Sequence, residues 1–372
     1  MLWLLACAVP EPVVSVPFGG LKTGGPGELS SWTVTVQSLA PLTEFPWSGS
    51  WSGGELEPDA VRTAEVRAPL GHSVSLLFQD EDALAYVTLP LFDGREASPG
   101  TWTGGWKIVS EGSLQDVDAL IGLEEFIAVE VVVDSPWTFT LTVTNVSDEP
   151  VLGPGVMVVH SDDHPLLVDE QLGLEELQAG DVSSIAADLE SRTGLFSMIG
   201  PGVWVLHDAD QPLFEEGGAA SPGLEVLAED GSPLPLAQAL INEGYEVGVF
   251  GPGDATDGYH PILPGEASDF RFEAAGGTKL SIASMFIQSN DLFMAPQGAG
   301  VVLEERDVSD QLAYWDAGTE VNQEPGFGPD QGPRQHAANT GDADGDVAVR
   351  LANDGYVYPE LTDILRVSIV ED

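Results

Sequence analysis

Hydrophobic and polar residues alternate with a period of two in several stretches of the chain. The clearest is WTFTLTVTN, residues 137–145, in which apolar side chains alternate with four threonines. SSWTVTVQSL, SVSLLFQ, IAVEVVV, FRFEA, KLSIASMFI and ILRVSIV show related patterns between Gly and Pro turns. A period of two places alternate side chains on opposite faces of a strand, and a threonine face is typical of an antiparallel sheet. The sequence therefore predicts an all-β protein built as an antiparallel β-sandwich with short helices.

The same pattern suggests where the parts of the chain begin and end. Residues 8–27 are rich in Pro and Gly without a period, which predicts a linker. Residues 28–135 are predicted to form an N-terminal β domain, and residues 136–372 a second and larger β domain. The Trp-rich pieces PWSGSWSGG and GTWTGGWKI are interpreted as loops of the first domain.

An internal repeat lies in the second predicted domain. GPGVMVVHSDDHPLL begins at Gly153 and GPGVWVLHDADQPLF begins at Gly200, and each copy is followed by a Gly-Leu-Glu that predicts a short helix. We expect a duplication within one domain, over residues 153–190 and 200–241, because two copies are too few for a solenoid. His160 and His207 recur at the strand ends and are interpreted as residues that bond to loop backbone.

Charge narrows the classes of partner. The chain has 12 Lys and Arg residues against 61 Asp and Glu residues, which gives a formal net charge of −49. Binding to nucleic acid or to anionic lipid headgroups needs a basic surface, so neither partner is expected. A surplus of carboxylates favours solubility in salt and binding of hard cations.

The N-terminus predicts export. The chain opens MLWLLACAVPEP, and Leu4-Leu5-Ala6-Cys7 resembles the site at which bacterial lipoprotein signals are cleaved and the cysteine is lipidated. Residues 1–7 are therefore interpreted as a truncated signal, since the apolar run is short and lacks a basic segment. Cys7 is the only cysteine, so no intramolecular disulfide can form. We expect a secreted or cell-surface protein whose only membrane attachment is a lipid on Cys7.

Four segments in the second half carry a resemblance to a known family. GPGVWVLHDADQPLF, SPGLEVLAEDGSPLPLAQAL, LSIASMFIQSNDLFMAP and YWDAGTEVNQEPGFGP, in this order, resemble the spondin domain of F-spondin and of secreted microbial proteins. The resemblance covers about Trp137 to Asp372. It implies a C2-like sandwich that holds a calcium ion by loop carboxylates and attaches to extracellular matrix or to surfaces. The implied calcium ligands are Asp291, Asp316 and Glu320, although the family more often has Asp at the last position.

The chemistry of these residues agrees with a cation site. Calcium takes six to eight oxygen ligands, and loop carboxylates can supply several of them. Two carboxylates ~5 Å apart repel each other by ~3 kcal/mol at an effective dielectric constant near 20, so clustered acids need a cation between them. We expect Gly318 to allow a sharp turn between Asp316 and Glu320, and Trp315 to anchor the loop in the core.

A weaker cation candidate is GDADGD, which spaces Asp342, Asp344 and Asp346 as in a calcium loop. It lacks the glycine and the glutamate that an EF-hand loop needs, so chance clustering is the better interpretation. Solvated acidic loops that bind nothing remain the alternative for the whole acidic surface.

Enzyme signatures are absent: the sequence has no G-x-S-x-G, H-E-x-x-H, Walker A or G-x-G-x-x-G after a strand. The sequence thus predicts a non-catalytic calcium-binding module that binds a matrix component, a surface protein or a glycan. Two alternatives stay open. One is a secreted polysaccharide hydrolase that uses paired carboxylates and exposed Trp residues, and the other is a passive structural surface protein.

Overall fold

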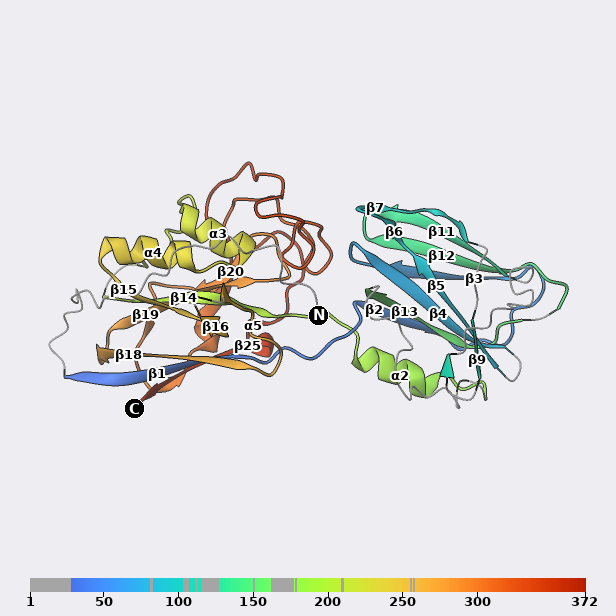
Figure 1. Ribbon diagram of the computed structural model, residues 1–372, viewed down its shortest axis with the longest axis horizontal. Helices are drawn as coiled ribbons and strands as arrows, with labels where there is room; N and C mark the ends of the chain where they lie inside the picture. The colour runs from blue at the N-terminus through green and yellow to red at the C-terminus, as the bar shows by residue number, and fades with distance from the viewer. Residues whose placement is uncertain are drawn as a thin grey trace. The chain divides into compact units, whose positions relative to one another are not determined.

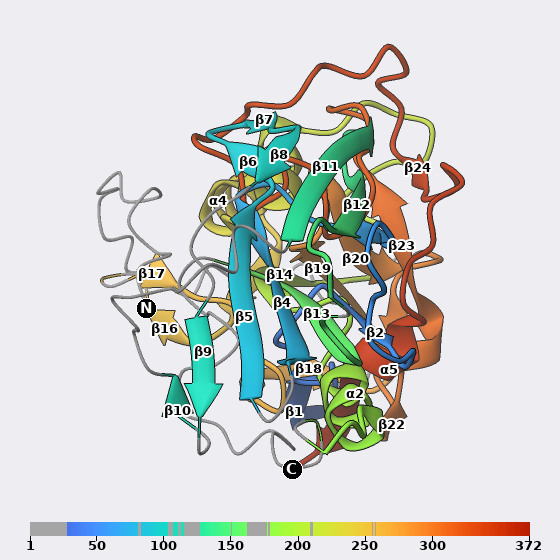
Figure 2. The same ribbon diagram turned by 90° about the vertical axis from the view of Figure 1, so that its right-hand side faces the viewer.

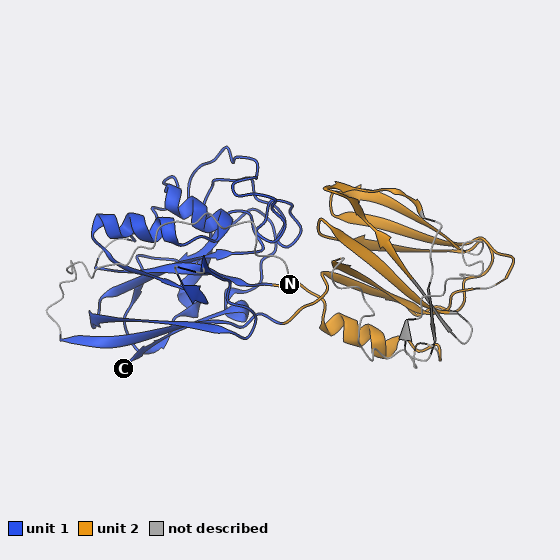
Figure 3. Cartoon of the chain, in the orientation of Figure 1, with its two compact units in different colours: residues 1–41, 197–372 blue, residues 42–196 orange. Residues whose placement is uncertain are grey.

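The computed structural model describes residues 28–80, 83–102, 107–110, 113–114, 127–149, 151–161, 177, 179–208, 211–254, 256 and 258–372. They form mostly antiparallel β-sheets with a few short helices, which confirms the all-β prediction (Figure 1). The chain divides into two compact units: residues 1–41 and 197–372 form unit 1, and residues 42–196 form unit 2 (Figure 3). The predicted signal at 1–7, with Cys7, and the linker at 8–27 lie outside the described residues.

The domain boundary predicted at residues 135/136 is wrong. Strand β1 (Leu29–Ser38) pairs with β18 (Ala267–Ala275) and β25 (Leu365–Glu371), so it belongs to unit 1. Strands β12 (Thr138–Asn145) and β13 (Gly155–Ser161) belong to unit 2. Unit 2 is therefore inserted into unit 1 after its first strand. Alternation shows that a segment forms a strand with one apolar face, but it does not identify the strands that will pair with it.

Unit 1 contains two main sheets. The smaller has the strand order β18-β1-β25-β22, where β22 is Arg306–Asp307. The larger has the order β15 (Glu246–Phe250), β14 (Ile199–His207), β19 (Lys279–Phe286), β20 (Leu292–Pro296), β23 (Leu312–Asp316) and β24 (Arg350–Leu351). The remaining elements are β21 (Val301–Val302), which pairs with β19, the hairpin β16 (Gly253–Asp254) and β17 (Gly258–Tyr259), η2 (Ser309–Gln311) and α5 (Leu361–Ile364).

Both faces of the larger sheet of unit 1 are buried. On one face Trp204 stacks on Phe270 of the smaller sheet, with ring centroids 5.4 Å apart. The helices α3 (Pro222–Asp230) and α4 (Leu234–Glu243) cover the other face (Figure 1). Helix α3 follows Ser221, whose hydroxyl accepts a hydrogen bond from the Leu224 N–H at 3.2 Å. The helix predicted after the second repeat copy is thus confirmed, whereas its counterpart after Gly173 lies outside the described residues.

Unit 2 also contains two main sheets. The larger has the order β10 (Ser113–Leu114), β9 (Lys107–Ser110), β5 (Ala83–Pro90), β4 (His72–Asp80), β13 and β2 (Trp47–Trp51), and the smaller has the order β3 (Val61–Arg67), β12, β11 (Ile127–Ser135) and β8 (Gly100–Trp102). A short hairpin pairs β6 (Phe92–Asp93) with β7 (Glu96–Ala97). The helix α2 (Ser183–Ser191) lies against β2 and β13 and buries Ile185 and Leu189 (Figure 2).

The Trp-rich segment at residues 47–51 is the edge strand β2 and not the predicted loop. Trp51 stacks on Phe78 with ring centroids 4.9 Å apart, and both Trp47 and Trp51 pack against the core between the sheets. These side chains are therefore used in packing.

The two units share one pairing topology. The order β10-β9-β5-β4-β13-β2 in unit 2 corresponds to β24-β23-β20-β19-β14-β15 in unit 1, and β3-β12-β11-β8 corresponds to β18-β1-β25-β22. The first strands of unit 1, β1 and β14, correspond to the last strands of unit 2, β12 and β13, so the two chain orders differ by a circular shift. The registers also agree. Gly155 and Gly202, the third residues of the two repeat copies, pair with Phe78 of β4 and Ser284 of β19, and these two strands correspond to each other.

The predicted duplication is thus real in its strands but wrong in its placement, because the copies lie in separate units. The recurring histidines make the same buried contact in each unit. His160 Nε2 lies 2.7 Å from Ser75 Oγ, and His207 Nε2 lies 2.8 Å from Ser281 Oγ. The neighbouring strand supplies these serines, and His160 Nδ1 lies 2.8 Å from the carbonyl oxygen of Ser161, the last residue of β13. These contacts are to strand residues and not to the loop backbone that the sequence predicted. Within the described part of the chain, no helix has the length and apolar character needed to span a membrane.

Candidate functional site

The three predicted ligands come from adjacent segments at one end of the larger sheet of unit 1. Asp291 immediately precedes β20, and Asp316 is the last residue of β23, where it pairs with Leu292. Glu320 follows four residues later, in the long connection from β23 to β24 that residues 317–349 form. All three side chains are buried, with at most 3% of the residue surface exposed. Strand pairing therefore explains why residues that are distant in sequence meet here.

The Asp291 carboxylate holds the loop that carries Glu320. Its Oδ2 accepts hydrogen bonds from the backbone N–H groups of Thr319 and Glu320, both at 3.0 Å, and from the Thr319 hydroxyl at 3.3 Å. Its other oxygen, Oδ1, is buried and makes no hydrogen bond. One oxygen of this carboxylate is thus hydrogen-bonded to the loop, and the other oxygen has no hydrogen-bond partner.

Glu320 shows the same division. Its Oε1 accepts a hydrogen bond from the Gly341 N–H at 2.8 Å, and its Oε2 is buried without a hydrogen bond. The amide of Asn290 lies near enough to stabilise the charged form, but it does not meet the geometry of a hydrogen bond to this oxygen. The side-chain oxygen of Asn322 is a third buried oxygen without a partner in this loop. Buried acceptors without partners are uncommon in native proteins and call for an explanation.

Asp316 has a different environment because a guanidinium group compensates its charge. Arg350 NH2 lies 2.7 Å from Asp316 Oδ2 and 2.6 Å from Asp344 Oδ2. The Gly318 N–H donates to Asp316 Oδ1 and the Asn322 amide donates to Asp316 Oδ2, each at 2.7 Å. Asp344, part of the GDADGD segment, is thus joined to Asp316 through Arg350.

The loop has the anchors that its sequence predicts. Gly318 has φ +68°, and a Cβ there would lie 2.8 Å from the carbonyl oxygens of Asp346 and Ala348. Trp315 is 2% exposed, donates from Nε1 to the Ala295 carbonyl oxygen at 3.3 Å, and packs against Phe214. The sharp turn and the aromatic anchor are both confirmed.

A buried arginine organises the rest of the connection. Arg334 donates from Nε to the Gly328 carbonyl oxygen at 2.8 Å and from NH2 to Gln288 Oε1 at 3.1 Å, and it also contacts the Gln331 amide. Burial lowers the pKa of Arg334 to about 9. This residue ties the 323–335 segment to the loop that precedes Asp291.

Sequence reasoning missed a fourth buried acid, Glu229, in the last turn of α3. It is 2% exposed, and its pKa is sensitive to the Thr319 side chain and to the charge of Glu320. The local sequence LAED gives no sign of this role, because the apolar residues Leu224, Leu227 and Ala228 already account for the buried face of the helix. Only the packing of α3 against the Trp315 segment brings Glu229 near the cluster.

Burial perturbs the acids of the cluster in one direction. It raises the pKa of Asp291 to about 7, with the charge of Asp316 adding to the effect and the N–H donors of Glu320 and Thr319 opposing it. Burial likewise raises the pKa of Glu320 to about 7 and that of Glu229 to about 7. The pKa of Asp316 is also raised by burial, but the Gly318 N–H, Asn322 and Arg350 counteract this. Such clustered shifts are typical of functional sites.

The cluster does not already have the arrangement of a metal centre. Within the described ranges, no group of three or more His, Cys, Asp or Glu side chains is placed as a set of metal ligands. The available donors are oxygens, which suit hard cations such as calcium better than transition metals. Cation binding here would require the free oxygens of Asp291 and Glu320 to turn toward a common point.

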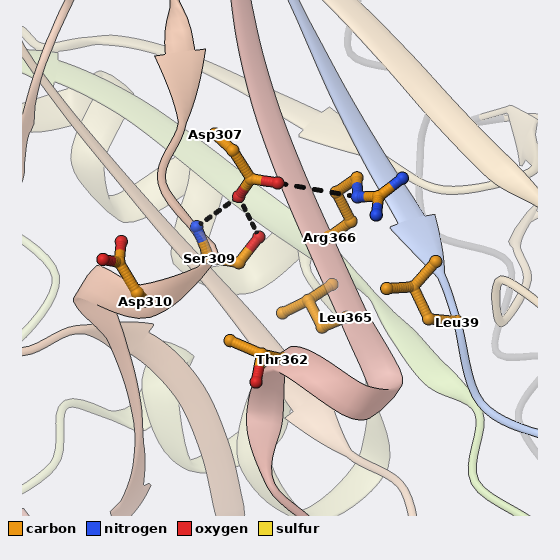
Figure 4. Close-up of a pocket in the computed structure, with 7 residues that line it drawn as sticks. All are labelled: Leu39, Asp307, Ser309, Asp310, Thr362, Leu365 and Arg366. Atoms are coloured by element: carbon orange, nitrogen blue, oxygen red, sulfur yellow. Dashed lines mark hydrogen bonds and ion pairs between the residues drawn. The ribbon is translucent and has the colours of Figure 1, made fainter.

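Two surface cavities lie elsewhere. The one in unit 1 has a volume of about 370 Å³ and is lined by Leu39, Asp307, Ser309, Asp310, Thr362, Leu365 and Arg366 (Figure 4). Asp307 accepts a hydrogen bond from the Ser309 N–H and pairs with Arg366 Nε at 3.5 Å, so its carboxylate is used within the fold. The one in unit 2, about 310 Å³, is lined by Ser48, Gly49, Ser50, Ala186, Leu189, Glu190 and Thr193. Neither lining includes the Trp that the hydrolase alternative requires.

No protein-family model matches the sequence, and no curated protein matches it. The resemblance to the spondin domain therefore stays a prediction from the four quoted segments.

Proposed function

We propose that the chain is an exported, non-catalytic calcium-binding module that attaches to an extracellular surface, a matrix component or a glycan. The observation that carries the calcium part is the pair of buried carboxylate oxygens, Asp291 Oδ1 and Glu320 Oε2, that lack hydrogen-bond partners. A buried anion without a partner is costly, and a bound divalent cation would supply the missing interaction for both. The residues that would bind the ion are Asp291, Asp316 and Glu320.

Calcium fits this donor set better than other common ions. The cluster offers carboxylate and amide oxygens and no His or Cys, which disfavours zinc and copper. Calcium accepts irregular shells of six to eight oxygens, and the backbone carbonyls of a long loop can complete them. Magnesium needs a small octahedral shell, which ligands from several separate segments satisfy less readily.

The attachment role and the extracellular location have separate support. Both rest on the spondin resemblance and on the predicted lipoprotein signal at Cys7, while the net charge of −49 suits a surface protein in saline surroundings. A calcium-ordered loop at one end of a sandwich would then present a fixed binding surface in the presence of calcium.

Calorimetry of the full chain tests the calcium part. Calcium at a hundredfold excess over Kd should stabilise the state that binds it by ~3 kcal/mol, seen as a higher melting temperature than in chelator. Asp291→Asn should remove most of this gain. Asp310→Asn makes the same change on an exposed acid of unit 1 and should leave the gain unchanged. A melting curve that is identical with calcium and with chelator would remove the proposed site.

The attachment part needs its own measurement. Binding of the full chain to an array of matrix proteins and glycans should depend on calcium and should be lost in Asp291→Asn. Equal binding in chelator would separate attachment from the calcium site.

A further inference from the structure

Strand β2 ends the larger sheet of unit 2, next to helix α2 (Figure 2). It pairs with β13 on one side, and no strand that the structure describes pairs with it on the other. In an antiparallel pair, alternate backbone N–H and C=O groups of each strand point away from the partner. Strand β2 therefore has a row of backbone donors and acceptors with which a further strand could pair.

Charged residues protect the other long edges of the main sheets. Of the edge strands that the structure describes, β3 (VRTAEVR), β15 (EVGVF) and β18 (ASDFRFEAA) are as long as β2 or longer, and each contains at least one charged residue. Charges on an edge strand disfavour pairing with a second chain. The sequence of β2, WSGSW, has no charge and no proline. This edge is thus open to pairing where the others are protected.

The side chains of β2 leave room for a further strand. Trp47 and Trp51 pack against the core between the sheets, while Ser48 and Ser50 line the cavity of about 310 Å³ at α2. Gly49, at the centre of the strand, lines the same cavity. The strand thus has its large side chains on the core face and small residues beside α2, where an added strand would place its own alternate side chains.

The sequence of β2 reads the same in both directions around Gly49. If two copies pair antiparallel about a two-fold axis at Gly49, Ser48 of each copy lies opposite Ser50 of the other, and Trp47 lies opposite Trp51. Aromatic pairs and hydroxyl pairs stabilise facing strands. A two-fold interface brings the same surface together from both subunits, so a strand with this symmetry is complementary to itself. A second copy of the chain is therefore the partner that β2 fits.

Charge sets the conditions for this pairing. The net charge of −49 on each copy opposes association at long range, and dissolved salt screens this repulsion. Of the residues that line the cavity at α2, one is charged, Glu190. Association through β2 should therefore strengthen as salt is added, whereas an interface of ion pairs would weaken.

We propose that two copies of the chain associate through β2, antiparallel about a two-fold axis at Gly49, so that the larger sheets of the two copies of unit 2 form one continuous sheet. The association does not depend on the calcium site of unit 1. It would give the proposed attachment function two binding surfaces in one particle, which raises the overall affinity for a surface.

Sedimentation velocity of the full chain, over the micromolar range and at low and high salt, tests the association. We expect a dimer whose fraction rises with protein concentration and with salt. Ser50→Glu changes an exposed side chain, so the variant should fold, and it should raise the dimer Kd about tenfold or more because the two copies bring two such charges into the interface.

Thr63→Glu is the matched control for Ser50→Glu. It places the same charge on an exposed residue of the edge strand β3 in the same unit, and it should leave the dimer Kd unchanged. A monomer at every concentration and salt, or an equal loss of association in both variants, would overturn the proposal.

Disulfide crosslinking tests the register. Chains with Ser48→Cys are mixed with chains with Ser50→Cys, both in a Cys7→Ser background, and oxidised. Opposite residues of an antiparallel pair have Cα atoms about 4.5–5.5 Å apart, which suits a disulfide, so the mixture should give a higher yield of covalent dimer than either variant alone.

Ser52→Cys is the control for the register, because Ser52 is exposed and follows β2 directly. In the proposed pairing its two copies lie on opposite sides of the axis, about 20 Å apart along the strands, so this variant should not crosslink. Covalent dimers of Ser52→Cys, or none from the Ser48→Cys and Ser50→Cys mixture, would contradict pairing about Gly49.

Discussion

Unit 1 and unit 2 have the same strand pairing, yet only unit 1 has the acidic cluster among the described residues. The difference lies between two equivalent strands. In unit 1, Asp316 pairs with Arg350, and residues 317–349 connect them. At the equivalent place in unit 2, Ser110 pairs with Ser113, and only residues 111–112 lie between them. The scaffold therefore does not make the site, which belongs to a long connection that one copy has and the other lacks.

The register shows how far the equivalence extends. Gly155 and Gly202 are opposite Phe78 and Ser284, and these pair in turn with Ala85 and Met294. The next strand pairings, β5 with β9 in unit 2 and β20 with β23 in unit 1, place Ser110 at the position that Asp316 occupies in unit 1. Unit 2 thus keeps the core ladders and has serine at a position where unit 1 has a buried acid.

The strongest test of the shared scaffold uses the two equivalent glycines. A Cβ at Gly202 would lie less than 3.0 Å from Phe250 and from the Ala283 carbonyl oxygen, and a Cβ at Gly155 would lie less than 3.0 Å from Phe78 and from the Leu77 carbonyl oxygen. Because backbone cannot move aside cheaply, Gly202→Ala and Gly155→Ala should each cost about 3 kcal/mol of unfolding free energy. Denaturant unfolding of the full chain measures both.

The controls for this pair are glycines that have open space around them. Gly298→Ala in unit 1 and Gly100→Ala in unit 2 meet nothing within 4 Å and should be nearly neutral. A large cost at one of the two equivalent glycines and none at the other would contradict the equivalence of the two sheets.

Much of this scaffold could be predicted from the sequence. The alternation of Trp32, Val34 and Val36 predicts β1 correctly, and the repeated GPGV segments identify β13 and β14 as equivalent strands. The assignment of β1 and β13 to units could not be predicted, because an apolar strand face is compatible with any sheet of suitable shape. Circular shifts leave no mark in local sequence.

The site was predictable to a smaller extent. Asp291, Asp316 and Glu320 came from the resemblance, and the structure brings them to one end of one sheet. Arg350 and Glu229 could not be anticipated, since an arginine 34 residues after Asp316 and a glutamate on a distant helix become neighbours only through the fold. Their charges decide which acids of the site have a compensating partner, so the electrostatics of the site could be described only from the structure.

Calcium should distinguish the two units in one experiment. With calcium at a hundredfold excess over Kd, amides of unit 1 that exchange only by unfolding should be protected by about 2.7 kcal/mol more than in chelator. Hydrogen exchange followed by mass spectrometry resolves segments of the full chain, and the gain should appear in residues 287–296 and 312–321. Residues 61–80 of unit 2 should show no gain. Equal gains in both units would mean that calcium acts on the chain as a whole.

In the absence of calcium, a change of pH should affect the stability of the two units differently. A carboxyl whose folded pKa exceeds its unfolded value binds protons more tightly in the native state, so native stability falls as pH rises from about 4 through the folded pKa. Burial raises the pKa of Asp291, Glu320 and Glu229 to about 7 in the folded protein, whereas the described residues of unit 2 include no buried Asp or Glu. In chelator, unit 1 should therefore lose stability between pH 5 and pH 8, and unit 2 should change less.

Hydrogen exchange or segment-resolved proteolysis at the two pH values measures this loss. High salt, which screens the general repulsion of an acidic surface, should leave most of the difference between the units in place. Asp291→Asn should flatten the dependence of unit 1. A steeper loss in unit 2 than in unit 1 would contradict the assignment of the buried acids.

The smallest expected effect concerns the feature that the two units share most closely, the buried His–Ser pair. Ser75→Ala removes the hydroxyl that lies 2.7 Å from His160 Nε2, and Ser281→Ala removes the one 2.8 Å from His207 Nε2. Loss of a buried hydrogen bond costs about 1 kcal/mol, so Ser281→Ala should cost about that much, and Ser75→Ala should cost more because Ser75 Oγ also lies 2.9 Å from Thr88 Oγ1. Neither change should alter the calcium response, since both serines lie within the strands β4 and β19 and not in the 317–349 connection. Unfolding free energies in chelator and in calcium measure both statements. A calcium response that depends on Ser281 would show that the connection and the scaffold are coupled, and would end the separation of site from scaffold on which the comparison rests.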